Sequence, residues 1–170
     1  NTMLDIAETE AGVGELTLDS IDMNKLIIDA CELYRAIARE KHIMLNAQIP
    51  EEEVYYLGDK AKMQRLIANF LDNAMKYTPA QGSVQVTLED TGTTIVIRFT
   101  DTGIGIPSSE IPRIFDRFYR GDASRSSAGT GLGLSLAKAI AEAFGGSIHV
   151  ESALNEGSVF TVILPHRFPT

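Results

Sequence analysis

Residues 84–105 read VQVTLEDTGTTIVIRFTDTGIG, and the pattern of this segment is the strongest indication of the architecture. Apolar and polar residues alternate over 84–88 and again over 95–99, which is the period of a half-buried strand. Asp90-Thr91-Gly92 lies between them and has the composition of a tight turn, so the two strands are expected to form a hairpin. The second strand ends at Asp101, and a turn with Gly103 and Gly105 follows it. The stretch therefore predicts a hairpin that presents a carboxylate at its end.

Helical and strand patterns surround this hairpin. After residue 14 the sequence predicts four helices, over Asp19 or Ser20 to about Lys41, Gly58-Asp59 to about Lys76, Ser109 to Phe118, and Leu132 to Phe144 with Gly145-Gly146 as its C-cap. Further strands are expected over Ile43 to Ile49, Val54 to Leu57, Ser147 to Glu151, and Ser158 to Leu164. This order indicates an α/β fold with a mixed sheet of about five strands and helices packed on one face. A doubly wound parallel sheet is disfavoured, because strands and helices do not alternate strictly.

Composition bounds the class of protein. The 170 residues fit one domain with a proper core, and 44% hydrophobic and 22% charged residues are ordinary globular values. The formal net charge of −8 argues against nucleic-acid binding, which needs clustered cations, but it allows the binding of a single nucleotide. The single cysteine, Cys31, excludes an internal disulfide, and its helical surroundings predict a buried thiol.

The sequence also allows expectations about membrane-spanning segments, about the N-terminal residues and about one internal loop. No apolar run approaches the roughly 20 residues that span a bilayer, and no signal peptide is visible. The chain begins with Asn1 rather than Met, so we expect it to be a piece of a longer protein. Residues 1–11 have a helical pattern that Gly12 and Gly14 interrupt, and the polar segment 119–128 is expected to be a mobile loop.

Three groups of residues together suggest a nucleotide site. Asp101 offers an acceptor for an exocyclic amine, and the glycine cluster 129–133 opens a helix whose first amides could hold an anion. Asn69, Asn73 and Lys76 follow one another at intervals of four and three residues, so they share one side of a helix. They offer an amide oxygen for a hard cation and a positive charge for phosphate. These features predict a nucleotide-binding domain.

Each feature also has a purely structural explanation. Asp-x-Gly-x-Gly can be a strand end with a glycine turn, and glycines can precede any helix. Asn73 can be a solvated surface residue, and Lys76 can complement the dipole at a helix C-terminus. The dinucleotide fingerprint does not apply, because a polar loop rather than a strand precedes the glycines. A phosphate loop with Gly-Lys-Ser/Thr is absent.

The order of these features resembles bacterial two-component sensor histidine kinases. Residues 69–79, NFLDNAMKYTP, are similar to the asparagine box of that family, and 101–107, DTGIGIP, to its first glycine box. Residues 115–120, FDRFYR, resemble the phenylalanine box, and 129–134, GTGLGL, the second glycine box. The resemblance covers about residues 58–165 and implies a two-layer α/β sandwich of the GHKL (Bergerat) type, shared with gyrase, the Hsp90 chaperones and MutL. Residues 1–14 resemble the tail of the dimerisation helix and its linker, with 15–170 as the catalytic ATP-binding domain.

Residue roles follow from this resemblance. Asp101 would accept a hydrogen bond from the adenine amino group, with Gly103 and Gly105 letting the base approach, and Asn73 would coordinate Mg²⁺. Lys76 and Arg120 would lie near the terminal phosphates. The other implied nucleotide contacts are Tyr77, Ile106, Gly129, Thr130, Gly131, Leu132, Gly133 and Leu134.

The resemblance also implies a mobile lid over the nucleotide, but it assigns roles to the residues near this lid less firmly. Phe115 and Phe118 would anchor a mobile lid, although a core role explains them equally well. Arg125 lies within the lid, and a solvated side chain is a more favoured role for it than that of a phosphate ligand.

The implied function is that of a protein-histidine kinase with ATP and Mg²⁺ as cofactors. Its partners would be a response regulator and its own dimerisation domain, and its parent would be a homodimer anchored in the bacterial inner membrane with this domain in the cytoplasm. None of His42, His149 and His166 has the acceptor setting of the family, which is a histidine followed by an acidic residue on a helix. We therefore expect the acceptor histidine to lie outside this sequence.

Two alternatives remain open from the sequence. One is an ATPase clamp of the gyrase or Hsp90 kind. It is disfavoured because Asn69, a poor general base, occupies the position at which those ATPases carry the glutamate that activates water. The other is a pseudo-kinase scaffold that has lost nucleotide binding, which the intact boxes disfavour.

Overall fold

The computed structural model describes residues 15–116 and 133–166. The expectations for residues 1–14, for the segment 119–128 and for Phe118 fall outside this range. The helices and strands are β1 (Asp19–Asp22), α2 (Met23–Lys41), β2 (Met44–Gln48), β3 (Tyr55–Gly58), α3 (Lys60–Tyr77), β4 (Ser83–Asp90), β5 (Thr94–Asp101), α4 (Gly133–Ala143), β6 (Ser147–Ala153) and β7 (Gly157–Pro165). Within the described residues, no helix is both long and apolar enough to cross a membrane.

Five strands form the main sheet in the order β2-β4-β5-β7-β6. β2 runs parallel to β4, and every other neighbouring pair is antiparallel, so the sheet is mixed. The predicted hairpin is β4–β5, in which Val86 lies opposite Phe99 and Asp101 lies opposite Val84. The prediction of a mixed five-stranded sheet is confirmed.

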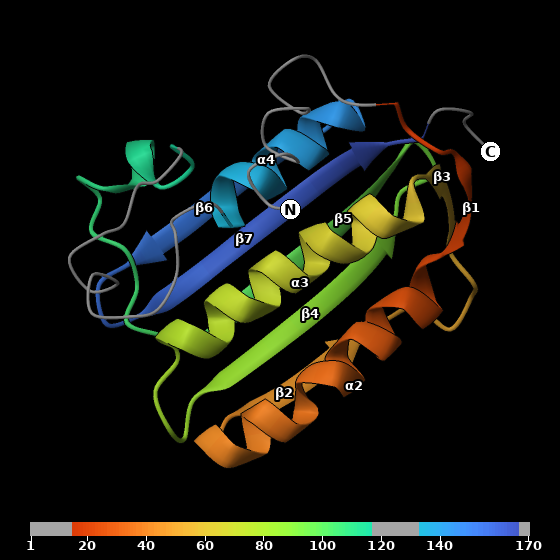
Figure 1. Ribbon diagram of the computed structural model, residues 1–170. Helices are drawn as coiled ribbons and strands as arrows, with labels where there is room; N and C mark the ends of the chain where they lie inside the picture. The colour runs from red at the N-terminus through yellow and green to blue at the C-terminus, as the bar shows by residue number, and fades with distance from the viewer. Residues whose placement is uncertain (1–14, 117–132, 167–170) are drawn as a thin grey trace.

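The three helices cover one face of this sheet (Figure 1). Apolar residues of the strands point towards the helices, while the opposite face carries exposed polar side chains such as Gln85, Arg98 and His149. This alternation is the pattern of a sheet that is buried on one side only. The fold is therefore a two-layer α/β sandwich, as the sequence predicts.

Aromatic packing fixes α3 over the centre of the sheet. The ring of Phe70 stacks on Phe99 of β5, with centroids 4.8 Å apart, and lies 5.3 Å from the ring of Phe160 of β7. All three side chains are at most 2% exposed. Burial of such a side chain contributes about 1.5–3 kcal/mol to stability. The C-terminal end of α3 is thereby held beside the end of β5.

A second, smaller sheet corrects the predicted start of the first helix. Residues 19–22 form β1, which pairs antiparallel with β3, and α2 begins only at Met23. The carboxylate of Asp22 caps α2 by accepting a hydrogen bond from the backbone of Lys25, at 3.1 Å. Ile21, which is 2% exposed, lies opposite the buried Tyr56. Burial of these two side chains favours strand pairing over one more helical turn.

The predicted helix over 109–118 is also corrected. Its described part contains only a 3₁₀ turn, Ile111–Arg113. Pro112 lies in the first turn of this element, where its missing backbone donor is tolerated, and it disfavours an α-helix that begins as early as Ser109. The predicted end of α4 is confirmed, because Gly145 has a φ of +80° and its N–H donates to Glu142. Cys31 is buried, as expected.

Candidate functional site

Asp101 ends β5 with its carboxylate almost fully enclosed. The residue is 8% exposed, and its Oδ1 accepts a hydrogen bond of 2.8 Å from the backbone N–H of Gly103. The backbone N–H of Ser158, its register partner on β7, lies near enough to this carboxylate to favour its ionised form. Two N–H groups leave part of its acceptor capacity unused, because a carboxylate has about four lone-pair sites.

Burial dominates the electrostatics of this group. It raises the pKa of Asp101 above the ordinary aspartate value, and the backbone N–H groups of Gly103 and Ser158 only partly oppose that effect. Within residues 15–116 and 133–166, Asp101 makes no ion pair with a Lys or Arg. Among the described residues the carboxylate is therefore short of donors, and a neutral ligand with an N–H donor would complete its shell.

The glycines of the turn are required by the chain itself. A Cβ on Gly103 would lie 2.6 Å from the carbonyl oxygen of Tyr77, and Gly105 has a φ of +75°. A Cβ on Gly105 would lie 1.9 Å from the carbonyl oxygen of Ala153. The turn thus packs against the end of α3 on one side and the β6–β7 turn on the other. This contact between backbones explains both glycines without reference to a ligand.

Helix α3 places Asn69, Asn73 and Lys76 on the side that faces α4. The side-chain amide of Asn69 donates to the carbonyl of Gly133, the first residue of α4, at 3.1 Å. Asn73, half-buried, lies one turn further along the same side, and Lys76, exposed, lies in the last turn.

Tyr77 connects this helix to the turn formed by residues 101–106, which begins with Asp101. Its carbonyl accepts a hydrogen bond of 3.1 Å from the backbone N–H of Ile104, and its side chain is half-buried. The end of α3 and the turn after β5 are therefore in direct contact. This contact brings Lys76 and Asp101 to the same end of the sheet.

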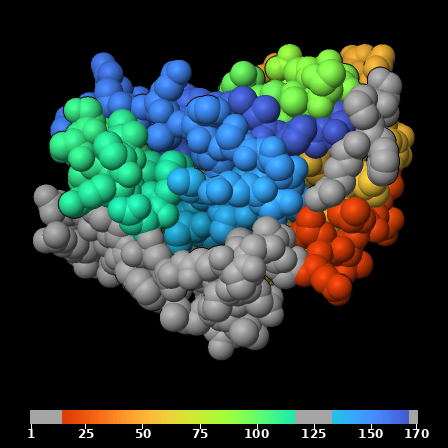
Figure 2. All heavy atoms as spheres, turned by 90° about the horizontal axis from the view of Figure 1, so that it is seen from above, coloured from red at the N-terminus to blue at the C-terminus, as the bar shows by residue number. Residues whose placement is uncertain are grey.

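The start of α4 and the segment before residue 117 border the same region. Gly133 is exposed, and Leu134 packs against the core. Figure 2 shows the green segment that ends at residue 116 lying against the light-blue α4. Phe115 supports this contact, because the ammonium of Lys138 lies 5.9 Å from its ring and Phe160 packs edge-on against it. The candidates Arg120, Gly129, Thr130, Gly131 and Leu132, together with Arg125, lie outside the described residues.

The sequence interpretation missed the contribution of the last hairpin. The hydroxyl of Ser152 accepts a hydrogen bond from the N–H of Ile106 at 2.8 Å, and the N–H of Asn155 donates to the carbonyl of Ile104 at 2.7 Å. Ile106, a predicted nucleotide contact, is half-buried against the core. The only signal for these contacts in the sequence was a pair of serines, one five residues before Gly157 and one directly after it.

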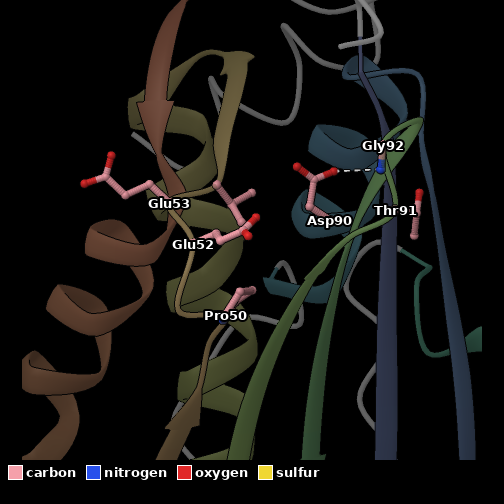
Figure 3. Close-up of a pocket in the computed structure, with 7 residues that line it drawn as sticks. Pro50, Glu52, Glu53, Asp90, Thr91 and Gly92 are labelled. Atoms are coloured by element: carbon pink, nitrogen blue, oxygen red, sulfur yellow. Dashed lines mark hydrogen bonds between the residues drawn. The ribbon is translucent and has the colours of Figure 1, made fainter.

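A separate pocket of about 310 Å³ lies at the opposite end of the β4–β5 hairpin. In Figure 3, Glu52 and Asp90 line it, whereas the carboxylate of Glu53 points away. Asp90 accepts hydrogen bonds from the N–H of Gly92 at 2.9 Å and from the ring of His166 at 3.0 Å. Negative charge here would repel phosphates, so this pocket does not suit a nucleotide.

All three histidines lie within the described residues. His42 caps α2 in the left-handed conformation, with φ of 57°, and His149 contacts the hydroxyl of Ser147 on β6. His166 is engaged by Asp90. None stands on a helix next to an acidic residue.

Comparisons with known proteins agree with this arrangement. The profile of the family described as histidine kinase-, DNA gyrase B- and HSP90-like ATPase matches residues 58–167. The chain is 42% identical to the sensor histidine kinase RppB of Synechocystis sp. over 145 residues, which cover 84% of this chain and 32% of RppB. The chain spans only 23% to 32% of the first curated relatives that it matches.

Solved structures show the same fold. Full-length ShkA in complex with AMPPNP superposes with a TM-score of 0.87 at 29% identity, over 98% of this chain and 35% of ShkA. The nucleotide-free catalytic domain of the histidine kinase ThkA superposes with a TM-score of 0.78 at 27% identity, over 88% of this chain and 97% of that domain. The chain therefore belongs to the family of histidine kinase-, DNA gyrase B- and HSP90-like ATPases, and within it to the catalytic ATP-binding domains of histidine kinases.

Proposed function

We propose that this chain binds Mg-ATP between α3, the turn after β5 and the start of α4, and that it transfers the γ-phosphoryl group to a histidine outside this sequence. Residues 15–170 form the catalytic domain in this proposal, and residues 1–14 are the end of the dimerisation helix and its linker. A response-regulator aspartate then receives the phosphoryl group. The partners are inferred from the relatives, which are named sensor histidine kinases.

The enclosed carboxylate of Asp101 is the observation that carries the proposal. It is buried, it lacks an ion-pair partner within the described residues, and two backbone N–H groups do not exhaust its acceptors. The exocyclic amine of adenine is a neutral N–H donor that would satisfy it. Guanine presents a carbonyl oxygen at the corresponding position. The carboxylate would repel this oxygen, because both groups are hydrogen-bond acceptors. Asp101 is thus suited to select adenine.

The donor set also fits a metal that is held mainly by phosphates. Within the described residues, no group of three or more His, Cys, Asp or Glu side chains could hold a metal ion alone. Mg²⁺ commonly takes one or two protein ligands and completes its shell with phosphate oxygens and water. Asn73 offers one amide oxygen on the side of α3 that faces α4, so the ion would bind together with the nucleotide.

The chain's own residues position and shield the reacting group in this scheme. Asp101 orients the base, Lys76 places a positive charge near the phosphates, and Tyr77 flanks the nucleotide. Bound Mg²⁺ would neutralise charge on the phosphates as the γ-phosphoryl group departs. Arg120 and the segment 129–133, which consists of Gly129, Thr130, Gly131, Leu132 and Gly133, are proposed to complete the contacts with the nucleotide. Water must be kept out, because it would compete with the acceptor histidine.

The ATPase-clamp alternative lacks its general base. Asn69 occupies the position at which a hydrolytic relative would carry a glutamate, and its amide already donates to Gly133. An amide cannot take a proton from water at neutral pH. The site is therefore suited to hold ATP until an acceptor arrives.

Calorimetry tests the proposal. Wild type is expected to bind Mg-ATP and Mg-ADP in preference to Mg-GTP, and Asp101→Asn should lose that preference because an amide presents donors as well as an acceptor. Binding at concentrations well above Kd should stabilise the folded state by roughly 2–4 kcal/mol. Asp90→Asn, at the far end of the same hairpin, is the matched control and should keep the preference.

Two results would contradict the proposal. Absence of binding at millimolar Mg-ADP would favour a nucleotide-free scaffold. Incubation of the chain alone with labelled ATP should leave it unlabelled, and a phosphoprotein that is labile in acid but resistant to base would show that one of its own histidines is the acceptor.

A further inference from the structure

A network of hydroxyl groups ties the last hairpin to the proposed base-binding turn. Ser152, on β6, contacts three groups through a single oxygen. The N–H of Ile106 donates to it at 2.8 Å, the carbonyl of Gly157 lies 2.9 Å away, and the hydroxyl of Ser158 lies 2.7 Å away. These partners come from both sides of the turn formed by residues 101–106.

The donors and acceptors of this network can be assigned. A serine hydroxyl has one hydrogen and two lone pairs. Ser152 donates its hydrogen to the carbonyl of Gly157, because that carbonyl can only accept. The hydroxyl of Ser158 must then donate to Ser152, whose second lone pair receives the N–H of Ile106. Ser152 is therefore fully satisfied, with no capacity left for another role.

This single oxygen holds both ends of the turn. Ile106 closes the turn and is bonded to Ser152 directly. Asp101 opens it and lies opposite Ser158 in the β5–β7 pairing, and the hydroxyl of Ser158 binds Ser152. Ser158 is 7% exposed, so water does not readily replace these bonds. Removal of the Ser152 hydroxyl would free the N–H of Ile106 and the donor of Ser158 together.

We propose that Ser152 is a positioning residue for adenine selection: its hydroxyl fixes the turn so that the Asp101 carboxylate meets the base amine. This inference rests on the proposed function, because it concerns the same nucleotide site. Ser152 itself touches no nucleotide in this scheme. It acts by holding Ile106 and the strand that carries Ser158.

The test compares Ser152→Ala with Ser152→Thr, which keeps the hydroxyl, and with Ser147→Ala at the other end of β6. Calorimetry with Mg-ADP, Mg-GDP and Mg-tripolyphosphate separates base recognition from phosphate binding. Ser152→Ala should bind Mg-ADP about tenfold more weakly, and its preference for ADP over GDP should shrink. Its affinity for tripolyphosphate, which has no base, should not change. Ser152→Thr should retain most of the preference, and Ser147→Ala all of it.

Hydrogen exchange in the wild-type protein provides a second readout that does not need a folded variant. The amide of Ile106 should be protected, because it is bonded to Ser152. Fast exchange of that amide would overturn the inference, and so would an unchanged ADP preference in Ser152→Ala or an equal loss for ADP and tripolyphosphate. Should wild type itself show no adenine preference, the proposed function fails first, and the inference fails with it. If wild type prefers ADP over GDP and Ser152→Ala keeps that preference, the inference about Ser152 is wrong while the proposed function stands.

Discussion

The side-chain amide of Asn69 donates a hydrogen bond to the backbone carbonyl of Gly133, at 3.1 Å and across 64 positions of sequence. This bond links the middle of α3 to the first residue of α4. The two helices carry different parts of the proposed phosphate site, so their separation at this point sets its width.

Replacement of Asn69 by Asp tests that link. The carboxylate would face a carbonyl oxygen instead of donating to it, and the repulsion should loosen the first turn of α4. We expect a loss of up to about tenfold in affinity for Mg-ADP, together with a stability loss of about 1 kcal/mol. Titration calorimetry and chemical denaturation measure the two effects. Asn46→Asp, an exposed substitution on β2 with the same charge change, should leave both unaltered; a similar loss there would point to net charge as the cause.

Gly105→Ala should destabilise the fold much more than Gly92→Ala. Both residues have positive φ, of +75° and +94°, so each alanine costs about 1–2 kcal/mol in backbone strain. A Cβ at Gly105 would also lie 1.9 Å from the carbonyl oxygen of Ala153, whereas Gly92 has open space around it. Such overpacking adds about 1–3 kcal/mol. Urea denaturation of both variants checks the difference, and equal losses would mean that the β6–β7 turn yields easily.

Local patterns were sufficient to predict most of the elements that build the site. The alternation over 84–88 and 95–99 correctly indicated β4 and β5, and the helical spacing of apolar residues correctly indicated α3. Asp101 was expected at a strand end and lies there. These signals depend on residues that are close in sequence, so they can be read without knowledge of the tertiary structure.

Pairing between distant segments could not be read in the same way. Strand β1 forms because Ile21 is buried opposite Tyr56, 35 positions later, and nothing in residues 19–22 alone announces that partner. The bond between Ser152 and Ile106 spans 46 positions and involves a residue type that is common on surfaces. The reason for Gly105 was likewise hidden, because its close neighbour Ala153 is distant in sequence.

Asp59 should contribute more to stability than an ordinary helix cap. Its Oδ1 accepts a hydrogen bond from the N–H of Lys62 and caps α3, while its Oδ2 accepts the N–H of Thr17 at 3.0 Å. Loss of a cap costs about 0.5–2 kcal/mol, and a second hydrogen bond to a charged group adds about 1.5–3 kcal/mol. Asp59→Ala is therefore expected to cost more than Asp22→Ala, which removes only the cap of α2.

Chemical denaturation of these two variants gives the comparison. Asp59→Asn should recover part of the loss, because its amide oxygen can still accept one of the two bonds. Equal destabilisation by Asp59→Ala and Asp22→Ala would show that the bond to Thr17 contributes nothing.

Acid should affect adenine binding and stability in opposite directions through Asp101. Burial raises its folded-state pKa above the ordinary 3.8, so between that value and the raised one the folded state binds more protons than the unfolded state. The contribution of Asp101 to the free energy of unfolding therefore falls as pH rises through this window and is constant above it. Affinity for Mg-ADP shows the reverse trend, because the adenine amine needs the ionised carboxylate as its acceptor: it rises with pH through the same window and then levels off.

Other carboxyl groups titrate in the same range, so the difference between wild type and Asp101→Asn isolates the effect. Burial alone would raise the pKa of Asp90, but its hydrogen bonds to Gly92 and His166 outweigh that and lower it, so Asp90 loses its stabilising contribution as pH falls. This background is common to both proteins and cancels in the difference. Denaturation and calorimetry from about pH 4 to about pH 8 should show both trends in the wild type relative to the variant. A difference between the two proteins that does not vary with pH would mean that Asp101 does not change its protonation state in this range, and it would contradict the prediction.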